Sequence, residues 1–229
     1  MTGGAAERYR ELRRAVGEEA HRCGRDPSQI AVVGIAKGQP NENVAAAITA
    51  GLADVGENYL QEARRRFPAL PAVRKHFVGH VQTNKARAIS ALFDVVQSVD
   101  RLEAATALSR AAQMQEKTLA VLLQLNVSPA ERFGCAPADA PRLAEALRRL
   151  PGLALHGVMA IGPLTGERSE ISSAFELAAK TLARIGGSTL SMGMSGDWRE
   201  AVRAGSTMLR IGEALFGHRP SKGGTCERL

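Results

Sequence analysis

The 229-residue chain is poor in aromatic side chains and in cysteine, and it contains no long apolar run. Phe, Trp and Tyr make up only 4% of it, which leaves few rings on which nucleic acid bases could stack. The three cysteines, Cys23, Cys135 and Cys226, lack metal-type spacing, as is typical of free thiols in a reducing cytoplasm. No stretch reaches about 18 uncharged apolar residues and the first residues have no apolar signal core, so we expect neither a membrane span nor secretion.

Positive charge is in excess, with 30 Lys and Arg residues against 23 Asp and Glu residues and a formal net charge of +7. The excess comes mostly from arginines spread over helix-like segments, as in the runs 64–66 and 148–149. A basic chain can bind nucleic acid, but attraction to a phosphorylated ligand or simple solubility explains this charge at least as well. Because a stacking platform is also lacking, we expect no nucleic acid partner.

Apolar runs and helix-like segments alternate along the chain, which predicts a parallel sheet. The runs expected to form strands are 30–36, 54–56, 76–81, 95–98, 119–127, 153–161, 189–192 and 208–211. The helix-like segments between them are 43–50, 60–67, 84–92, 101–115, 138–150, 170–185 and 197–204. This pattern, without a second composition block, favours one domain over residues 1–229, a single α/β (β/α)8 TIM-type barrel, over an open doubly wound sheet.

The two ends of the chain add little to this barrel. Residues 6–22 precede the first strand and carry Leu12, Ala15 and Val16 at helical spacing, which predicts an additional N-terminal helix on the bottom or flank of the barrel. Residues 217–229 contain Pro220, Gly223 and Gly224, and we expect them to form a flexible tail.

Lys37 ends the first apolar run. An amine at the carboxyl end of a barrel strand lies where such folds place their chemistry. Partial burial would lower its pKa and leave more neutral amine to form an imine with an aldehyde. A lysine in this position is, on its own, more often a solvated strand end, and only the loops described next favour the chemical role.

Two segments rich in glycine and hydroxyl groups, 191–197 and 205–212, contain the ends of the seventh and eighth expected strands, at 191–193 and 210–212, and each of these ends is followed by a loop. Backbone N–H groups near Gly193 and Gly212 can approach phosphate oxygens closely, and barrels often bind phosphate between these two loops. The glycines could also serve tight turns alone. Together with Lys37, the loops favour a phosphorylated aldehyde held as an imine.

Three further polar residues are candidates for the same site. Arg210 lies inside the apolar run 208–211, so it needs a partner, either a structural ion pair or the ring nitrogen of a bound pyridine. Asn58 and His80 follow the second and third strands and could line a cofactor pocket or make ordinary loop contacts. His76 and His80, four residues apart on a strand, span more than about 13 Å, so we predict no metal site there.

Several segments, taken together, resemble the pyridoxal phosphate homeostasis protein family, the single-domain relatives of the alanine racemase N-terminal barrel. They are 36–37, 56–62, 76–85, 97–100, 157–161 and the two C-terminal loops. The resemblance implies pyridoxal 5'-phosphate held as an aldimine on Lys37, with Arg210 facing the pyridine nitrogen. It also implies that Ser191, Gly193, Ser206 and Gly212 surround the phosphate, with Asn58 and His80 near the cofactor.

The family is regarded as a group of cofactor carriers or regulators without established catalysis, so we expect a non-catalytic cytoplasmic monomer. Its expected partners are pyridoxal phosphate and the apo-enzymes that need it. The alternative is a weak racemase-like enzyme, which needs an acid or base on each ligand face. Larger racemases take one of these, a tyrosine, from a second domain that we do not expect here, so Tyr59 or His80 would have to substitute.

The chain departs from the family pattern at two positions. Glu213 stands where the family often has Thr or Ser, which removes a hydroxyl contact and places a carboxylate near the expected phosphate. Ala36 replaces the commoner serine before the lysine, so the residue beside Lys37 is less polar than usual.

Overall fold

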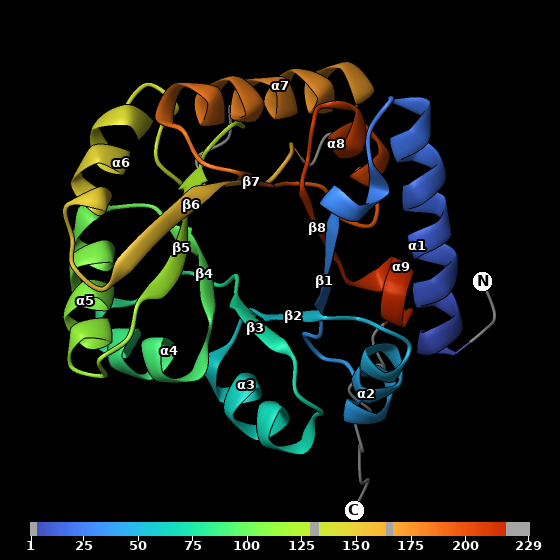
Figure 1. Cartoon of the computed structure of the whole chain (residues 1–229), viewed down its shortest axis with the longest axis horizontal. Helices are drawn as coiled ribbons and strands as arrows, with labels where there is room; N and C mark the ends of the chain where they lie inside the picture. Colours follow the sequence, from blue (N-terminus) through green and yellow to red (C-terminus); the bar gives the residue numbers. More distant parts are fainter. Residues whose placement is uncertain (1–3, 129–132, 164–166, 219–229) are drawn as a thin grey trace, which may run out of the picture.

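The computed structural model describes residues 4–128, 133–163 and 167–218, which form a closed barrel of parallel strands in the order β1 to β8 (Figure 1). The strands are β1 (Ala31–Ile35), β2 (Asp54–Glu57), β3 (Arg74–Phe77), β4 (Val95–Val99), β5 (Leu119–Leu125), β6 (Leu153–Ala160), β7 (Thr189–Ser191) and β8 (Met208–Ile211). β8 pairs with β1 and closes the ring, so the predicted (β/α)8 architecture is confirmed.

Helices connect the strands on the outside of the barrel. They are α1 (Ala5–Arg22), α2 (Asn41–Thr49), α3 (Leu60–Arg66), α4 (Ala86–Leu92), α5 (Leu102–Gln113), α6 (Ala140–Arg148), α7 (Arg168–Ile185), α8 (Trp198–Arg203) and α9 (Glu213–Phe216). Short 3-10 turns η1 (Pro27–Gln29), η2 (Phe67–Ala69) and η3 (Thr83–Lys85) also occur. The sequence pattern anticipated α1 to α8 within about two residues at each end, whereas it missed α9 because four residues are too few to show a helical period.

The third strand is the clearest difference from the expectation, since β3 ends at Phe77 rather than at residue 81. Beyond Phe77, the Val78 N–H still donates to the carbonyl of Glu57, but the chain then leaves the sheet. Gly79 passes so close to the loop that follows β2 that an added Cβ would lie 2.0 Å from the carbonyl oxygen of Asn58. The apolar residues after Phe77 therefore form a packed loop at the barrel rim, which an alternation count cannot distinguish from strand.

Helix α1 lies on the flank of the barrel beside α2, α8 and α9 (Figure 1). Its residues Leu12 and Val16 are buried, as their spacing predicted. Arg8 donates from Nε to the carbonyl of Leu215 at 3.0 Å and from Nη2 to that of Phe216 at 2.7 Å. These bonds tie the first helix to the last one, so α1 covers the point where β8 meets β1.

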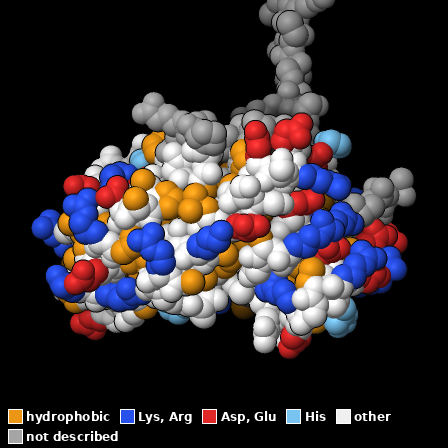
Figure 2. Space-filling model, turned by 90° about the horizontal axis from the view of Figure 1, so that it is seen from above, with side chains coloured by type: hydrophobic (Ala, Val, Ile, Leu, Met, Phe, Trp, Pro, Cys, Tyr) orange, Lys and Arg blue, Asp and Glu red, His pale blue; other side chains and the backbone are white. Residues whose placement is uncertain are grey.

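The residues expected in the tail lie mostly outside the described part of the chain. Gly217, which is described, donates its N–H to Glu213 and accepts from Gln39 Nε2 at 3.1 Å. Within the described ranges, none of the helices is both long and apolar enough to cross a bilayer. On the flank seen in Figure 2, Lys and Arg side chains alternate with acidic and apolar ones and form no single basic stripe.

Candidate functional site

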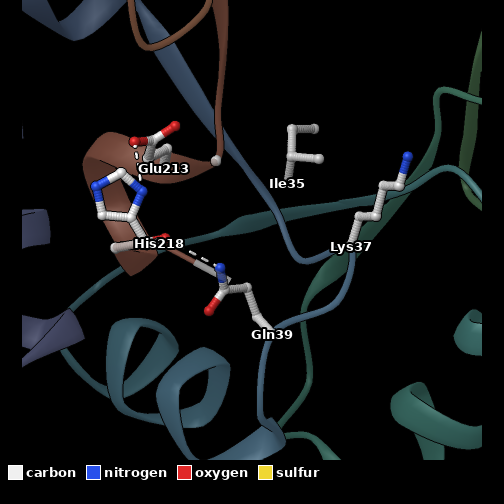
Figure 3. Close-up of a pocket in the computed structure, with 7 residues that line it drawn as sticks. Ile35, Lys37, Gln39, Glu213 and His218 are labelled. Atoms are coloured by element: carbon white, nitrogen blue, oxygen red, sulfur yellow. Dashed lines mark hydrogen bonds and ion pairs between the residues drawn. The ribbon is translucent and has the colours of Figure 1, made fainter. Parts of the chain in front are cut away.

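The loop after β1 places Lys37 at the carboxyl end of the barrel, half-buried in the wall of a cavity of about 420 Å³. The other lining residues come from the end of β1, the loop after it, and both ends of α9; they are Ile35, Gln39, Gly212, Glu213, Gly217 and His218 (Figure 3). A cavity of this size lies in the range that holds small ligands. The structure therefore brings Lys37 and Gly212, two of the residues expected from sequence, into one cavity.

The amine of Lys37 is separated from the carboxylate that shares its cavity. In Figure 3 its side chain extends away from Glu213 and His218, and Nζ lies 4.8 Å from the centroid of the Tyr59 ring. Glu213 instead pairs with Nδ1 of His218 at 2.9 Å, and its side chain is 62% exposed. The Glu213 carboxylate is thus turned toward His218 and away from Lys37.

Helix α3 holds the Lys37 loop on both sides of the lysine. Arg66 donates from Nη2 to the carbonyl of Ala36 at 3.0 Å, and the N–H of Gly38 donates to Oε2 of Glu62 at 3.3 Å. Glu62 and Arg66 lie four residues apart, so they occupy the same face of the helix. The backbone that carries Lys37 is therefore fixed before and after it by one short helix.

Arg66 is itself anchored by a buried ion pair with Glu57 at the end of β2. Its Nε lies 2.6 Å from Glu57 Oε1, and its Nη1 donates to Asn41 Oδ1 at 2.8 Å. Burial raises the pKa of Glu57, whereas the bond and the charge of Arg66 lower it. Sequence reasoning missed this pair, because Arg66 belongs to a run of arginines that indicates a solvated face. The one sequence feature that pointed to a buried partner was Glu57, a carboxylate at the end of a buried strand.

A second set of polar residues forms a hydrogen-bonded chain across the inside of the barrel. His76 Nε2 lies 2.7 Å from Asp54 Oδ1, and His76 Nδ1 lies 2.9 Å from Gln97 Nε2. Gln97 Oε1 accepts from the Ser191 hydroxyl at 2.6 Å, and Ser191 Oγ accepts from Arg210 Nη1 at 2.7 Å. Since Gln97 is on β4 and Ser191 on β7, strands that are not neighbours, this chain crosses the barrel interior.

The direction of each bond in this chain follows from the one before it. The Arg210 guanidinium can only donate, so Ser191 accepts from it and directs its own hydroxyl proton to Gln97. The amide of Gln97 then donates to His76 Nδ1, which places the imidazole proton on Nε2, toward Asp54. The five side chains, Asp54, His76, Gln97, Ser191 and Arg210, thus fix one another's orientation.

Arg210 is nearly inaccessible, with 5% of its surface exposed. Burial lowers its pKa to about 10, against an opposing effect of the Asp197 carboxylate, and Nη2 donates to the carbonyl of Ala160 at 2.8 Å. For the Asp197 carboxyl the effect of burial is opposite in direction, since burial raises its pKa. This carboxylate accepts from the N–H of Met194 at 2.5 Å. The two bonds of Arg210 leave further N–H donors of the guanidinium for another acceptor.

We expect Gln97→Leu to destabilise the protein by at least about 2 kcal/mol, because both His76 Nδ1 and the Ser191 hydroxyl would lose a buried partner. Urea unfolding monitored by circular dichroism measures the change. Gln82→Leu, at an exposed position, is the control and is expected to change stability by less than about 0.5 kcal/mol. Equal effects of the two substitutions would contradict the chain of bonds described above.

The two expected phosphate loops contribute unequally. The Ser206 hydroxyl is buried and faces the carbonyls of Leu190, Met192 and Met208 at 3.2, 2.8 and 3.1 Å, so it and Ser191 are engaged inside the barrel, away from the Lys37 cavity. Ser195, which sequence reasoning left unassigned within the 191–197 motif, accepts from the N–H of Ala214 in α9 at 3.1 Å. This bond links the loop after β7 to the start of α9, next to Gly212.

Gly193 lies in the left-handed region at φ +95°, and an added Cβ would stand 2.6 Å from the Cβ of Ala201 and 2.9 Å from Leu209 Cδ2. We expect Gly193→Ala to destabilise the protein by about 2–4 kcal/mol, from backbone strain and overpacking together. Gly196 in the same loop has no atom within 4 Å of an added Cβ, so Gly196→Ala is the matched control. Thermal and urea unfolding measure the stability of the two variants. Equal unfolding midpoints would show that the loop tolerates a side chain at Gly193.

Asn58 and His80 line a different and larger cavity of about 690 Å³, between α3 and the η3–α4 segment. His80 stacks on Phe133 with ring centroids 4.0 Å apart, and its Nδ1 lies 3.7 Å from Asp100 Oδ2. Tyr59, which touches Lys37, lines this second cavity as well. Six of the sequence-predicted residues therefore fall into three groups, namely Lys37 and Gly212 in one cavity, Ser191 and Arg210 in the buried chain, and Asn58 and His80 in the second cavity. Gly193 and Ser206 belong to none of the three.

Comparison with known proteins shows which family this barrel belongs to. The profile described as "Alanine racemase, N-terminal domain" matches residues 8–220. The pyridoxal phosphate homeostasis protein of Pseudomonas aeruginosa is 44% identical over 220 residues, which cover 93% of this chain and 95% of that protein. The protein of the same name from Escherichia coli K12 is 37% identical over 228 residues, covering 93% and 96% of the two chains.

Solved structures agree with these sequence matches. The structure of PipY of Synechococcus elongatus with PLP bound superposes with a TM-score of 0.80 at 31% identity, covering 93% of this chain and all of that one (100%). An unknown protein from Bifidobacterium adolescentis gives 0.84 at 30% identity, over 93% and 94% of the two chains. Alanine racemase of Clostridium difficile, at 16% identity and a TM-score of 0.71, shares the fold over 92% of this chain and 57% of that one.

The closed parallel barrel and the profile match over residues 8–220 define a barrel of the alanine racemase N-terminal type. Within that class, the chain belongs to the pyridoxal phosphate homeostasis protein family.

Proposed function

We propose that this protein binds pyridoxal 5'-phosphate at the barrel mouth, covalently through Lys37, and takes part in the homeostasis of that cofactor in the cytoplasm. The observation that carries the proposal is the position of Lys37. It is a half-buried amine at the carboxyl end of β1, held by α3 and opening on a cavity of about 420 Å³. The names of the Pseudomonas and Escherichia relatives, and PLP bound in PipY, support the choice of ligand.

The residues present fit the chemical groups of this cofactor. Its aldehyde would react with the Lys37 amine to give an imine, with loss of one water molecule. The spare N–H donors of Arg210 suit an unprotonated pyridine nitrogen, because a protonated ring would place two positive charges side by side. Backbone N–H groups around Gly212 would bind the phosphate, since Ser191 and Ser206 are committed to bonds inside the barrel.

Arg210 would weaken the chemistry that the bound cofactor supplies, in keeping with a site that holds the cofactor. Pyridoxal phosphate supplies an electron sink when its ring nitrogen is protonated, and an arginine at that nitrogen weakens the sink. We therefore propose a carrier or regulator, acting as a monomer and passing the cofactor to enzymes that lack it.

Racemase-like catalysis is the second candidate, and one observation favours it. Tyr59 lies against the amine of Lys37, on the side of the neighbouring cavity, where a second acid or base could act. Exchange of the Cα proton of L-alanine into deuterated water, in the presence of pyridoxal phosphate, distinguishes the two. A carrier gives exchange no faster than free pyridoxal phosphate does, whereas a racemase gives fast exchange that Tyr59→Phe removes.

The proposal is tested by titrating the purified protein with pyridoxal phosphate, reducing the mixture with borohydride and mapping the modified peptide by mass spectrometry. We expect one equivalent of reduced cofactor, located on Lys37. Labelling spread over several lysines, or absent from Lys37, would contradict covalent binding at the barrel mouth.

A further inference from the structure

The cavity of about 690 Å³ between α3 and the η3–α4 segment remains without a role in the proposed function. It opens at the carboxyl end of the barrel, because the loops that follow β2 and β3 form its walls. Its volume is within the range of small-molecule sites and exceeds that of the Lys37 cavity. A hollow of this size at the functional end of a barrel is a candidate binding site.

The cavity is strongly basic. Arg64, Arg65 and Lys85 line it, and none of the three has an ion-pair partner within the described ranges. Its one carboxylate, that of Glu62, already accepts the N–H of Gly38 in the Lys37 loop. Several other exposed arginines form an ion pair with a carboxylate three or four residues away, as Arg14 does with Glu18 on α1. Three cations facing one hollow with a single engaged carboxylate attract an anion.

The other residues that line the cavity indicate what shape of ligand would fit it. The Tyr59 ring is 51% exposed at one wall, and Phe77, Leu60 and Ala88 contribute apolar surface. An exposed ring beside guanidinium groups suits a flat molecule, since both rings and guanidinium planes stack. Side-chain amides of Asn58, Gln61, Gln82 and Asn84 add neutral donors, of the kind that complete the coordination of a phosphate.

We propose that this cavity is a second binding site, for a small phosphorylated molecule with a planar ring. Arg64, Arg65 and Lys85 bind the phosphate, and Tyr59 stacks on the ring. Because Tyr59 also contacts the Lys37 amine, a ligand here lies next to the first site without occupying it. The proposal is independent of the proposed function, since an aromatic phosphate would bind here whether or not Lys37 carries an aldehyde.

Phenyl phosphate is the probe, added to the full-length protein while backbone amide shifts are followed by nuclear magnetic resonance. We expect saturable shifts at residues 58–65 and 82–88, with much smaller changes at residues 35–39 and 212–213. Calorimetry then measures the affinity of three proteins. These are the wild type, the double variant Arg64→Gln/Arg65→Gln, and the control Arg10→Gln/Arg184→Gln, which removes the same charge at exposed positions on α1 and α7.

We expect the Arg64→Gln/Arg65→Gln variant to bind at least tenfold more weakly and the control to bind like the wild type. Equal weakening of both variants would reduce the effect to net charge and overturn the site. Shifts confined to the Lys37 cavity, or no saturable binding, would overturn it as well. Benzoate is the comparison ligand: weaker binding than phenyl phosphate supports the phosphate assignment, and equal binding would refute it.

Discussion

Lys37→Ala is expected to abolish covalent attachment of pyridoxal phosphate and, with it, the visible absorption band of the imine. Only a primary amine placed in the cavity can form the carbon–nitrogen bond, and alanine removes it. The backbone of the variant should stay in place, since Arg66 and Glu62 hold the loop through the carbonyl of Ala36 and the N–H of Gly38. Absorbance spectra before and after borohydride reduction, with intact mass, measure the loss.

The matched control for this prediction is Lys180→Ala. Lys180 is an exposed lysine on α7 that pairs with Glu176 at 3.6 Å. The Lys180→Ala variant is expected to keep the full absorption band and to carry one equivalent of reduced cofactor. Non-covalent binding would survive in part in the Lys37 variant, because Gly212 and Arg210 are unchanged. If the Lys37 variant retained the wild-type band, another amine would have to carry the cofactor and the proposed function would fail.

Arg66→Met is expected to destabilise the protein by about 3–5 kcal/mol, since it leaves the Glu57 carboxylate buried and without its counter-charge. The loss is large against the roughly 5–15 kcal/mol by which proteins of ordinary stability are folded. It would also free the carbonyl of Ala36 and loosen the loop of Lys37. Arg65→Met, one residue earlier on an exposed side of α3, is the control and should change stability by less than about 0.5 kcal/mol.

The pH dependence of the Arg66→Met variant distinguishes a buried charge from lost packing. Burial raises the pKa of Glu57 above its ordinary 4.5, and without Arg66 the pKa rises further, because the bond and charge that lower it are gone. The folded variant therefore binds a proton that the unfolded chain has released, so its stability falls as pH rises through that window. We expect the deficit relative to wild type to be greatest at neutral pH and to shrink at acidic pH.

Adding Glu57→Gln to Arg66→Met removes the uncompensated charge and is expected to recover most of the lost stability at neutral pH. Urea unfolding at several pH values measures all of these variants. A double variant as unstable as Arg66→Met, with a deficit independent of pH, would show that packing rather than charge is responsible.

Only part of the candidate site could be predicted from the amino-acid sequence. Lys37 and Gly212 could be named because strand ends of a barrel meet at one face, and the structure brings both to one cavity. Arg210 could be named because a charge inside an apolar run needs a partner. Its actual partners are the Ser191 hydroxyl on β7 and the Ala160 carbonyl on β6. They depend on how the strands lie beside one another in the closed barrel, which local pattern does not contain.

Arg66 shows why the rest was hidden. It stands in a run with Arg64 and Arg65, and sequence alone assigns all three to a solvated face. In the fold Arg64 and Arg65 line an open cavity, whereas Arg66 turns inward to Glu57. Ser191 and Ser206 show the opposite case, since both belong to loops of the expected phosphate site but direct their hydroxyls into the barrel.

The sequence by itself determined the alternation of strands and helices, hence the barrel, and the lysine that closes the first strand. These follow from hydrophobic period and turn residues, which act over a few neighbouring positions. Only the tertiary structure decided that a buried ion pair fixes the lysine's loop, that five side chains form one chain across the interior, and that two cavities share Tyr59. Such contacts join residues far apart in the chain, and closure of the barrel alone sets which of them meet.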